Sequence, residues 1–427
     1  MQIISRTNII KALQSLSAYG ISHFITIIQP IIITPLITRR LSIEEYGTYS
    51  LYFVFLSFLI PIISLNFSSF VLKEFYNELK TELKKYLDIF ISISFISLIT
   101  ILGVTFIFKD LLKETLELPS INIVYYAVFS SFFLTIITLS KSVLRSQNQT
   151  KMFVLVNLFL VISITLMVSV LYYFDILSLN RVLAGFAITY GFGSLIIMRY
   201  VLKINLLPSF ILNTKIIKRV LKFSLPLVLY SLTAMIFLMS DRLIINHFIS
   251  KNNLAVYSAT FQLAFGVAAF GTVLQLAWNP FVFKQMTSNI VINRKIKVYG
   301  IIAIVCLVIY SIIYLVLFPI VFQWYYPIEY LGGLEFFHWF IFGGMIQSIY
   351  WLVNPILMVL EKNMYFFYIT LFSSVISICC NIYFVDFGIK YFALVYFISW
   401  LFQLIALISV TAYWYRKKIK LNLINVS

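Results

Sequence analysis

The chain has 427 residues, of which 62% are hydrophobic and only 11% are charged, whereas about 25% of the residues of a soluble domain are charged. This composition excludes a soluble globular protein and indicates an all-α fold whose helices are embedded in lipid. The net charge of +17 would suggest nucleic-acid binding in a soluble protein. Here the basic residues lie in short segments between apolar runs, so no nucleic-acid partner is expected.

Long apolar runs divide the chain into membrane-spanning helices. A hydrocarbon core of about 30 Å requires about 20 apolar residues in a helix, and this length recurs twelve times between charged residues. The run at 182–198 is short and rich in glycine, but small residues let helices pack closely, so we predict that it spans the membrane. The predicted spans are residues 17–38, 49–72, 87–108, 121–140, 152–174, 182–198, 223–240, 254–280, 298–321, 336–360, 365–385 and 391–415.

The basic residues predict how these helices are oriented. If the spans alternate from a cytoplasmic N-terminus, 24 of the 32 Lys and Arg residues fall on the inner side, as the positive-inside rule demands. Ten of the 15 acidic residues fall on the outer side. Both termini are therefore predicted to be cytoplasmic.

A basic segment, residues 203–222, is the longest interruption of the apolar pattern. It separates an N-terminal six-helix lobe, residues 1–202, from a C-terminal six-helix lobe, residues 223–427. Basic and apolar residues from Lys215 to Lys222 recur at helical spacing, which is typical of a helix lying on an anionic membrane surface. A solvated basic loop is the alternative interpretation of this linker.

The two lobes share a sequence repeat. ITRRLSIEEYGTYSLYF at 37–53 aligns without a gap on INHFISKNNLAVYSATF at 245–261. Both copies bridge the first and second helices of their lobe on the outer side, so the repeat is parallel and favours duplication of a six-helix unit over chance similarity. The matched residues include Ser42 with Ser250, Tyr49 with Tyr257, and Phe53 with Phe261.

These segments also carry a resemblance to a known family. PLITRRLSIEEYGTYS at 35–50, SDRLIINHFIS at 240–250 and LAWNPFVFKQM at 276–286 resemble the polysaccharide-transporter branch of the multidrug/oligosaccharidyl-lipid/polysaccharide exporter superfamily, in particular its repeat-unit (O-antigen) flippases. The resemblance extends over the whole chain. This chain has Ser-Ile at 42–43 where the family often has Gly-Pro, and Ala255 where the family has Gly, which lowers the weight of single motifs.

The resemblance implies a V-shaped pair of six-helix lobes around a central cavity, in the bacterial cytoplasmic membrane. It implies a transporter and not an enzyme. The substrate would be a lipid-linked oligosaccharide of the undecaprenyl-diphosphate type, moved from the inner to the outer leaflet by alternating access. The product would serve O-antigen, capsule or exopolysaccharide assembly, with a polymerase and other assembly proteins as partners besides membrane lipids. No cofactor is implied, and coupling to a Na⁺ or H⁺ gradient fits the superfamily.

Polar residues within the spans are candidates for lining the cavity. Each sugar hydroxyl that enters hydrocarbon unpaired costs about 4–8 kcal/mol, so the substrate requires a wet, polar path. Gln275 and Asn279 are four residues apart on one helix face, beside Pro280. Gln347 and Asn354 form a comparable set on another span. Amides that only join helices by hydrogen bonds are the alternative.

Charged residues at helix ends are candidates for binding the diphosphate, because a guanidinium forms planar bidentate hydrogen bonds and keeps its charge when desolvated. By the resemblance, Arg39 corresponds to an arginine at the end of the family's first helix, and Asp241-Arg242 to an acidic–basic pair at the outer end of the seventh. Lys141 and Arg145 are the candidates on the inner side. In the alternative interpretation, Asp241 pairs with Arg39 or Arg242 in a salt bridge that closes the outer gate.

Two other functions compete with the flippase. A cation-coupled multidrug antiporter of the same superfamily would usually carry a buried carboxylate in its N-terminal half to bind Na⁺ or H⁺. It is disfavoured because the first six spans contain no acidic residue except Asp88, at an edge. A membrane polysaccharide polymerase is disfavoured because no clustered carboxylates or metal-ligand spacings occur, and the three histidines, His23, His247 and His338, lie far apart in the sequence. We therefore predict no catalytic residues and no metal site.

Overall fold

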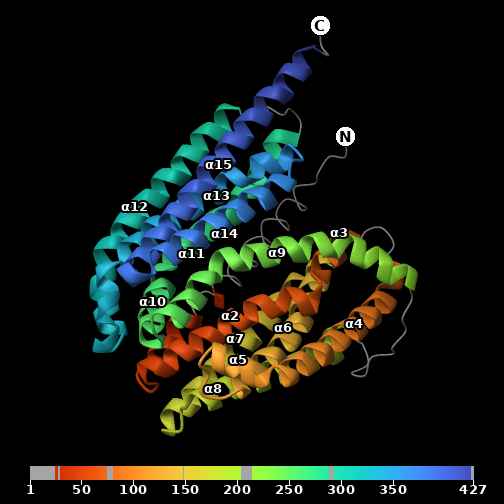
Figure 1. Ribbon diagram of the computed structural model, residues 1–427. Helices are drawn as coiled ribbons and strands as arrows, with labels where there is room; N and C mark the ends of the chain where they lie inside the picture. Colours follow the sequence, from red (N-terminus) through yellow and green to blue (C-terminus); the bar gives the residue numbers. More distant parts are fainter. Residues whose placement is uncertain are drawn as a thin grey trace. The chain divides into compact units, whose positions relative to one another are not determined.

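The computed structural model describes residues 25–26, 29–74, 80–147, 149–202, 214–287 and 293–424. All regular secondary structure in these ranges is helical (Figure 1). Eleven of the described helices are long and apolar enough to cross a membrane. The predicted class, an all-α integral membrane protein, is confirmed.

These eleven helices coincide with the eleven predicted spans from 49–72 onward. The short predicted span at 182–198 lies within the apolar helix Leu179–Tyr200 and is long enough to cross. The first predicted span, 17–38, lies partly outside the described residues, and its described part contains the apolar helix Gln29–Thr38. Apolar run length therefore located every span that the described part of the chain can test.

The chain divides into two compact units, Met1–Met235 and Ile236–Ser427. The division falls inside helix α9 (Thr214–Phe248), whereas the sequence predicts a linker at 203–222. Residues 214–222 form the first turns of α9, and the rest of that segment lies outside the described residues. The helix begins before the apolar run because Lys and Arg are good helix formers and do not interrupt it.

Helix α6 (Asn122–Ser146) is the centre of the first unit. It packs against α2, α3, α4, α7 and α8, so its buried residues form most of this unit's core. The other helices of the unit are α2 (Ile43–Ser64), α3 (Phe67–Glu74), α4 (Lys80–Ile107), α5 (Lys109–Thr115), α7 (Thr150–Tyr173) and α8 (Leu179–Ile197), which continues as the π-helical turn η2 (Met198–Leu202).

The predicted span 49–72 is interrupted in the structure. Helix α2 ends at Ser64, and Leu65 and Asn66 then adopt left-handed backbone conformations with φ of 45° and 48°. A left-handed residue after the last turn is a common way to end a helix. The Asn66 amide also donates a hydrogen bond of 2.8 Å to the Ser231 hydroxyl of α9. Apolar run length does not encode such a break.

Helix α13 (Phe337–Val359) is the centre of the second unit. It packs against α10, α11, α12 and α15. The predicted span 254–280 consists of two helices separated by a turn at Phe265, which together remain long enough to cross a membrane. Besides the end of α9, the other elements of the unit are α10 (Lys251–Ala264), α11 (Gly266–Thr287), α12 (Arg294–Tyr325), η3 (Ile328–Glu335), α14 (Met364–Tyr383), η4 (Val385–Phe387) and α15 (Ile389–Ile424).

The repeated segments occupy equivalent positions in the two units. Ser42 is the N-cap of α2, and its hydroxyl oxygen accepts a hydrogen bond of 3.2 Å from the backbone N–H of Glu45. Ser250 is the N-cap of α10, and its hydroxyl oxygen accepts a hydrogen bond of 3.2 Å from the backbone N–H of Asn253. Both serines start a helix in the same way, which supports the duplication inferred from the sequence.

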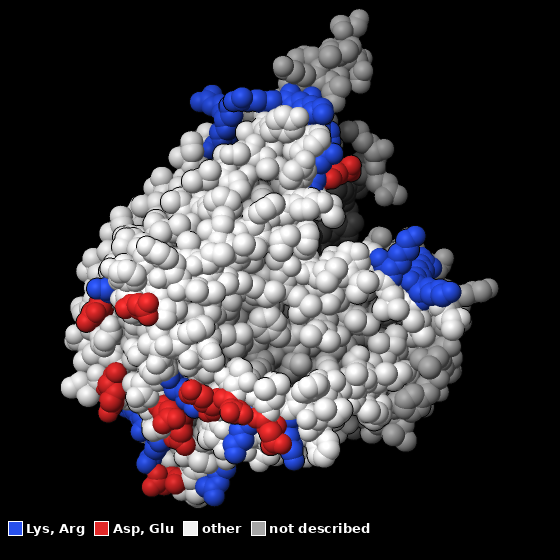
Figure 2. Space-filling model, viewed as in Figure 1, with Lys and Arg blue, Asp and Glu red and all other residues white. Residues whose placement is uncertain are grey.

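Charged side chains gather at the helix ends of each unit and leave a broad uncharged surface between them (Figure 2). Nine acidic residues lie where α2, α6 and α8 begin in the first unit, and where α13 and α15 begin in the second. An uncharged belt between charged ends is the surface expected of helices embedded in a bilayer. The acidic residues at these ends are Glu44, Glu45, Asp110, Glu114, Glu117 and Asp175 in the first unit, and Glu329, Glu335 and Asp386 in the second.

Candidate functional site

A buried ion pair lies near the end of α9, in the second unit. Asp241 and Arg242 keep only 7% and 6% of their surface exposed. The helix continues to Phe248, roughly 10 Å further along its axis at the helical rise, so the pair lies within the helix and not, as the predicted span 223–240 places it, beyond its end. Ionised residues at such positions are costly, and in membrane-spanning helices they mark functional sites by default.

The Asp241 carboxylate is fully engaged by hydrogen bonds. Its Oδ1 accepts from the backbone N–H of Arg242 at 2.8 Å and from the Arg242 Nη1 at 3.3 Å, and its Oδ2 accepts from the hydroxyl of Tyr257. Arg242 Nη1 also donates to the carbonyl oxygen of Leu238 at 2.9 Å. Of the two ion pairs considered for Asp241 from the sequence, the structure contains the one with Arg242.

Aromatic rings enclose the Arg242 guanidinium. Its central carbon lies 4.6 Å from the ring centre of Phe261 and 5.9 Å from that of Tyr257, both on α10. Phe340 of α13 packs against these two rings, at centroid distances of 5.0 Å to Tyr257 and 5.4 Å to Phe261. A desolvated cation over an aromatic face gains about 2 kcal/mol, so the rings help the carboxylate to hold this charge inside the unit.

Gln347 is joined to the ion pair through Tyr396. The Tyr396 hydroxyl of α15 donates a hydrogen bond of 3.1 Å to the Gln347 Oε1 of α13, and its ring packs edge-on against Phe261 at 5.4 Å. Gly343 permits this approach of α13 and α15, because a Cβ at Gly343 would overlap the Tyr396 ring and lie 3.5 Å from the Cα of Phe397. The cluster therefore draws side chains from α9, α10, α13 and α15.

The remaining predicted amides lie further along α11 and α13. The Trp278 indole N–H of α11 donates to the Leu352 carbonyl oxygen of α13 at 2.6 Å, and this contact sets Asn279 and Asn354 at the same level of the two helices. The Oδ1 atoms of both asparagines are buried and have no hydrogen-bond partner among the described residues. Gln275, one turn before Asn279, is half-buried. Unpaired buried amides indicate a place where water or a polar ligand is needed.

Several buried polar residues of the second unit are not predicted from the sequence. Ser399, Gln403 and Thr411 of α15 are buried, and each has a side-chain atom without a hydrogen-bond partner in the described part of the chain. Their spacing of four and eight residues places them on one helix face, so periodicity within the apolar span is a signal that would have found them. Tyr257 could have been found from the repeat, whereas nothing in the sequence distinguishes Tyr396 from the other tyrosines.

The predicted basic residues of the first unit lie at its two ends. Arg39 is exposed in the turn before α2, where its neighbour Arg40 forms an exposed salt bridge with Asp175. Lys141 and Arg145 lie on the last turns of α6, at the opposite end of the unit, with Lys141 half-buried and Arg145 exposed. Arg39 therefore does not share a site with Lys141 and Arg145.

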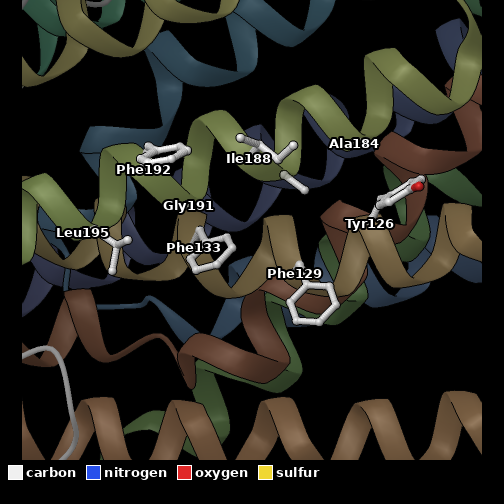
Figure 3. A pocket seen from close by; sticks show the side chains of 9 residues that line it. Tyr126, Phe129, Phe133, Ala184, Ile188, Gly191, Phe192 and Leu195 are labelled. Atoms are coloured by element: carbon white, nitrogen blue, oxygen red, sulfur yellow. The ribbon is translucent and has the colours of Figure 1, made fainter.

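An apolar cavity of about 400 Å³ opens between α6 and α8 of the first unit (Figure 3). Phe129 and Phe133 of α6 line it together with the small residues Ala184 and Gly191 of α8. Tyr126 supplies the only hydroxyl among the residues that line this cavity. Such a lining suits hydrocarbon chains and offers almost no hydrogen bonds to a sugar, so we do not place the candidate site there.

The fold and the site define an integral membrane protein with an ionic and polar cluster buried inside a helical unit, a construction typical of transporters. No group of three or more His, Cys, Asp or Glu residues that could hold a metal ion occurs among the described residues. Residues 12–286 match the model of the polysaccharide biosynthesis protein family, and the chain belongs to this family. No curated protein matches the chain.

Solved structures share the fold. A multidrug resistance MATE family transporter of the MOP superfamily, in an inward-facing conformation, has a TM-score of 0.68 at 13% identity, over 94% of this chain and 98% of its own. The lipid II flippase MurJ, in an inward closed conformation, has a TM-score of 0.71 at 14% identity, over 94% of this chain and 87% of its own. The resemblance to the polysaccharide-transporter branch of this superfamily is confirmed. At such identities the likeness shows the fold and not the substrate.

Proposed function

We propose that this protein is a flippase for a lipid-linked oligosaccharide. The family to which the chain belongs supports a role in polysaccharide biosynthesis, and the likeness to the flippase MurJ supports a fold suited to lipid-linked substrates. A sugar head group cannot cross hydrocarbon unaided, since each unpaired hydroxyl costs about 4–8 kcal/mol. The protein would provide a polar path for the head group while the apolar tail stays in the bilayer.

The observation that carries this proposal is the buried guanidinium of Arg242. Arginine has five N–H donors, and among the described residues those of Nη1 bond to Leu238 and Asp241. Neither of these bonds uses the Nε or Nη2 donors, so we infer that these donors would serve a ligand. A diphosphate would match them, because its oxygens accept the paired bonds of a planar guanidinium.

The other candidate residues would have different roles in transport, according to their positions in the units. Asp241 and Tyr257 would hold Arg242 in place through Nη1, and a diphosphate would bind the Nε and Nη2 donors of the guanidinium during transport. Gln347, deeper in the unit, and the unpaired Asn279 and Asn354 would bind sugar hydroxyls. Gln275 would contribute from the same face of α11.

The remaining predicted residues would act at the ends of the first unit. Lys141 and Arg145 would attract the diphosphate on the cytoplasmic side, and Arg39 would act at the outer side. Transport would run from the inner to the outer leaflet of a bacterial cytoplasmic membrane, with both termini cytoplasmic. The oligosaccharide would be of the undecaprenyl-diphosphate type and would supply O-antigen, capsule or exopolysaccharide assembly beside a polymerase. Coupling to a Na⁺ or H⁺ gradient stays a prediction.

The test is a flipping assay in proteoliposomes. The purified full-length protein is reconstituted with an undecaprenyl-diphosphate oligosaccharide whose terminal sugar binds a lectin, and the rate at which the sugar changes sides is measured. We expect Arg242→Gln to reduce the rate at least ~100-fold, and Arg242→Lys to reduce it ~10-fold, since lysine keeps the charge and loses the bidentate fork. Arg40→Gln, which removes an exposed arginine, is the matched control and should keep the wild-type rate.

One outcome would overturn the role of Arg242, and another would overturn the flippase itself. Wild-type flipping by both Arg242 variants would remove Arg242 from the mechanism. A wild-type protein that leaves the oligosaccharide in place and instead expels a fluorescent cationic drug would establish the antiporter. The antiporter has one observation in its favour, since the buried Asp241 carboxylate bonded to Tyr257 is the kind of acid that coupling to a cation gradient requires.

A further inference from the structure

A pocket of about 270 Å³ lies in the second unit where the turn between α13 and α14 meets the end of α15. It is lined by the basic residues Lys362, Lys417 and Lys418, by Trp414, and by Leu360 and Glu361. Three ammonium groups and one carboxylate give the lining an excess of positive charge. The pocket is remote from Asp241 and Arg242, because α13 begins near that ion pair and reaches the pocket only at its other end.

The turn after α13 fixes the position of Lys362. The backbone N–H of Glu361 donates to the carbonyl oxygen of Met358 at 2.9 Å, and the N–H of Lys362 donates to that of Leu357 at 3.4 Å. Glu361 is held at a φ of 59°, the left-handed position that usually belongs to glycine in this type of helix ending. The turn brings Lys362 to α15, where its ammonium lies over the Trp414 ring.

Two lysines converge on one tryptophan in this pocket. The Lys362 Nζ lies 4.0 Å from the ring centre of Trp414, and the Lys417 Nζ lies 5.0 Å from it. Each ammonium is attracted by the ring, but the two cations repel each other, and no salt bridge to either is present among the described residues. An anion between them would relieve the repulsion and bind to both, so the arrangement is suited to a phosphate group.

The surroundings of the pocket favour a lipid phosphate over a free one. The pocket lies at the mainly basic end of the unit (Figure 2), where α15 emerges from its uncharged belt. Met358, Met364 and Tyr413, which lie within two residues of the lining residues in sequence, are 38%, 61% and 60% exposed, so exposed apolar side chains beside the pocket are available to contact lipid. The volume equals about nine waters at ~30 Å³ each, which is enough for a phosphoglycerol head group.

We propose that this pocket binds the phosphate of an anionic membrane lipid from the leaflet at the basic end of the unit. Lys362 and Lys417 bind the phosphate oxygens, Trp414 holds both ammonium groups in place, and Lys418 adds charge at the rim. Glu361 opposes the ligand and limits the affinity. A bound lipid would tie the end of α15 to the α13–α14 turn, so it would stabilise the second unit.

The experiment compares lipids by thermal unfolding of the purified full-length protein in nanodiscs. Phosphatidylglycerol should raise the unfolding temperature above that in phosphatidylcholine, in proportion to its mole fraction, and salt should reduce the shift. Native mass spectrometry of the detergent-solubilised protein gives the affinity. At about fivefold per lysine near an anionic surface, Lys362→Gln with Lys417→Gln should weaken binding ~25-fold, and Glu361→Gln should strengthen it.

The controls distinguish a lipid site from a general effect of surface charge and from a site for free phosphate. Lys390 lies 5.4 Å from the ring centre of Tyr391 at the opposite end of the unit, so Lys390→Gln removes one similar lysine and should leave the affinity unchanged. Lys417→Arg keeps both the charge and the ring contact and should retain binding even if the glutamine variants unfold. An unchanged affinity in the double glutamine variant would overturn the proposal. Equal stabilisation by inorganic phosphate in phosphatidylcholine nanodiscs would also overturn it, because the site would then be one for free phosphate.

Discussion

At the scale of single residues, two buried tyrosine hydroxyls bond to acceptors of different charge. Tyr257 donates to the carboxylate of Asp241, whereas Tyr52 of the first unit donates to the neutral hydroxyl of Ser130 at 2.7 Å. A hydrogen bond to an ionised acceptor contributes about 1.5–3 kcal/mol, while neutral hydrogen bonds between membrane helices average about 0.6 kcal/mol. The two residues therefore offer a matched comparison.

We expect Tyr257→Phe to lower the free energy of unfolding by about 2 kcal/mol, because one oxygen of a buried carboxylate loses its donor. Tyr52→Phe should lower it by less than about 1 kcal/mol. Unfolding of the purified protein in mixed micelles, followed by circular dichroism against the mole fraction of dodecyl sulfate, measures both values. Equal losses in the two variants would show that Asp241 is not ionised in this environment.

The buried ion pair should show strong coupling. Arg242→Gln or Asp241→Asn alone leaves one buried charge without its partner, at a cost of about 3–5 kcal/mol. The double variant removes both charges, so its cost should be at least ~2 kcal/mol smaller than the sum of the single costs. The same cycle on Arg40 and Asp175, whose side chains are 38% and 72% exposed, should give a coupling below about 1 kcal/mol. Additive costs at Asp241 and Arg242 would show that the two charges do not stabilise each other.

Part of the candidate site was predictable from the sequence. The family resemblance points to Asp241 and Arg242 as a charged pair at a helix end, and Gln347 and Asn354 stand out as amides in an apolar run. The Asp241–Arg242 pair was one of the two pairs considered from the sequence, whereas the partner of Gln347 was not predictable. Tyr396 meets Gln347 across 49 positions of the chain, and local periodicity carries no information about which helix will pack on which.

At the scale of helices, α11 and α13 approach each other closely at Gly271. A Cβ at Gly271 would overlap the side chain of Ser348 and lie 3.2 Å from its Cα. Small residues at helix contacts allow such backbone approach in membranes, where packing replaces the hydrophobic effect as the driving force. The contact lies between the ion-pair cluster and the unpaired amides Asn279 and Asn354, so its geometry fixes the register of the polar residues.

Gly271→Ala should separate α11 from α13 and destabilise the protein by about 1–3 kcal/mol, because the added methyl group has no free volume. Ser348→Gly in the same chain should restore most of the loss, since it removes the overlapping atoms. A Cβ added at Gly103 of α4 would have no atom within 4 Å, so Gly103→Ala is the control and should not destabilise. Unfolding in mixed micelles measures all three, and a double variant as unstable as Gly271→Ala would contradict the steric explanation.

The helices themselves were largely predictable, and their interruptions were not. Apolar run length locates the spans because every backbone group in lipid must be bonded within its own helix. The break at Leu65 and the turn at Phe265 lie inside apolar runs that contain no charge to mark them. The break at Leu65 is accompanied by a tertiary contact, the hydrogen bond from Asn66 to Ser231, which run length cannot show.

At the scale of the whole molecule, successive spans cross the membrane in opposite directions, and this alternation determines which helix ends lie on the same side of the membrane. In a variant whose three cysteines are replaced by alanine, single cysteines are introduced at exposed positions. Lys113→Cys and Asp386→Cys probe the acidic ends of the first and second units, and Lys151→Cys and Asn363→Cys probe the opposite ends. Because basic ends stay in the cytoplasm, a membrane-impermeant maleimide should label positions 113 and 386 in intact cells, and positions 151 and 363 only after permeabilisation.

The labelling pattern of each unit separately tests how many helices cross the membrane before it. Labelling of position 151 in intact cells would reverse the orientation of the first unit and exclude a cytoplasmic N-terminus. If the glycine-rich span within Leu179–Tyr200 did not cross the membrane, every later helix would change direction. Positions 113 and 151 would then label as expected while positions 386 and 363 exchange their behaviour. That exchange would also place the lysine pocket near Trp414 on the outer side of the membrane. The same four variants therefore test the number of helices that cross the membrane and the leaflet that supplies the lipid.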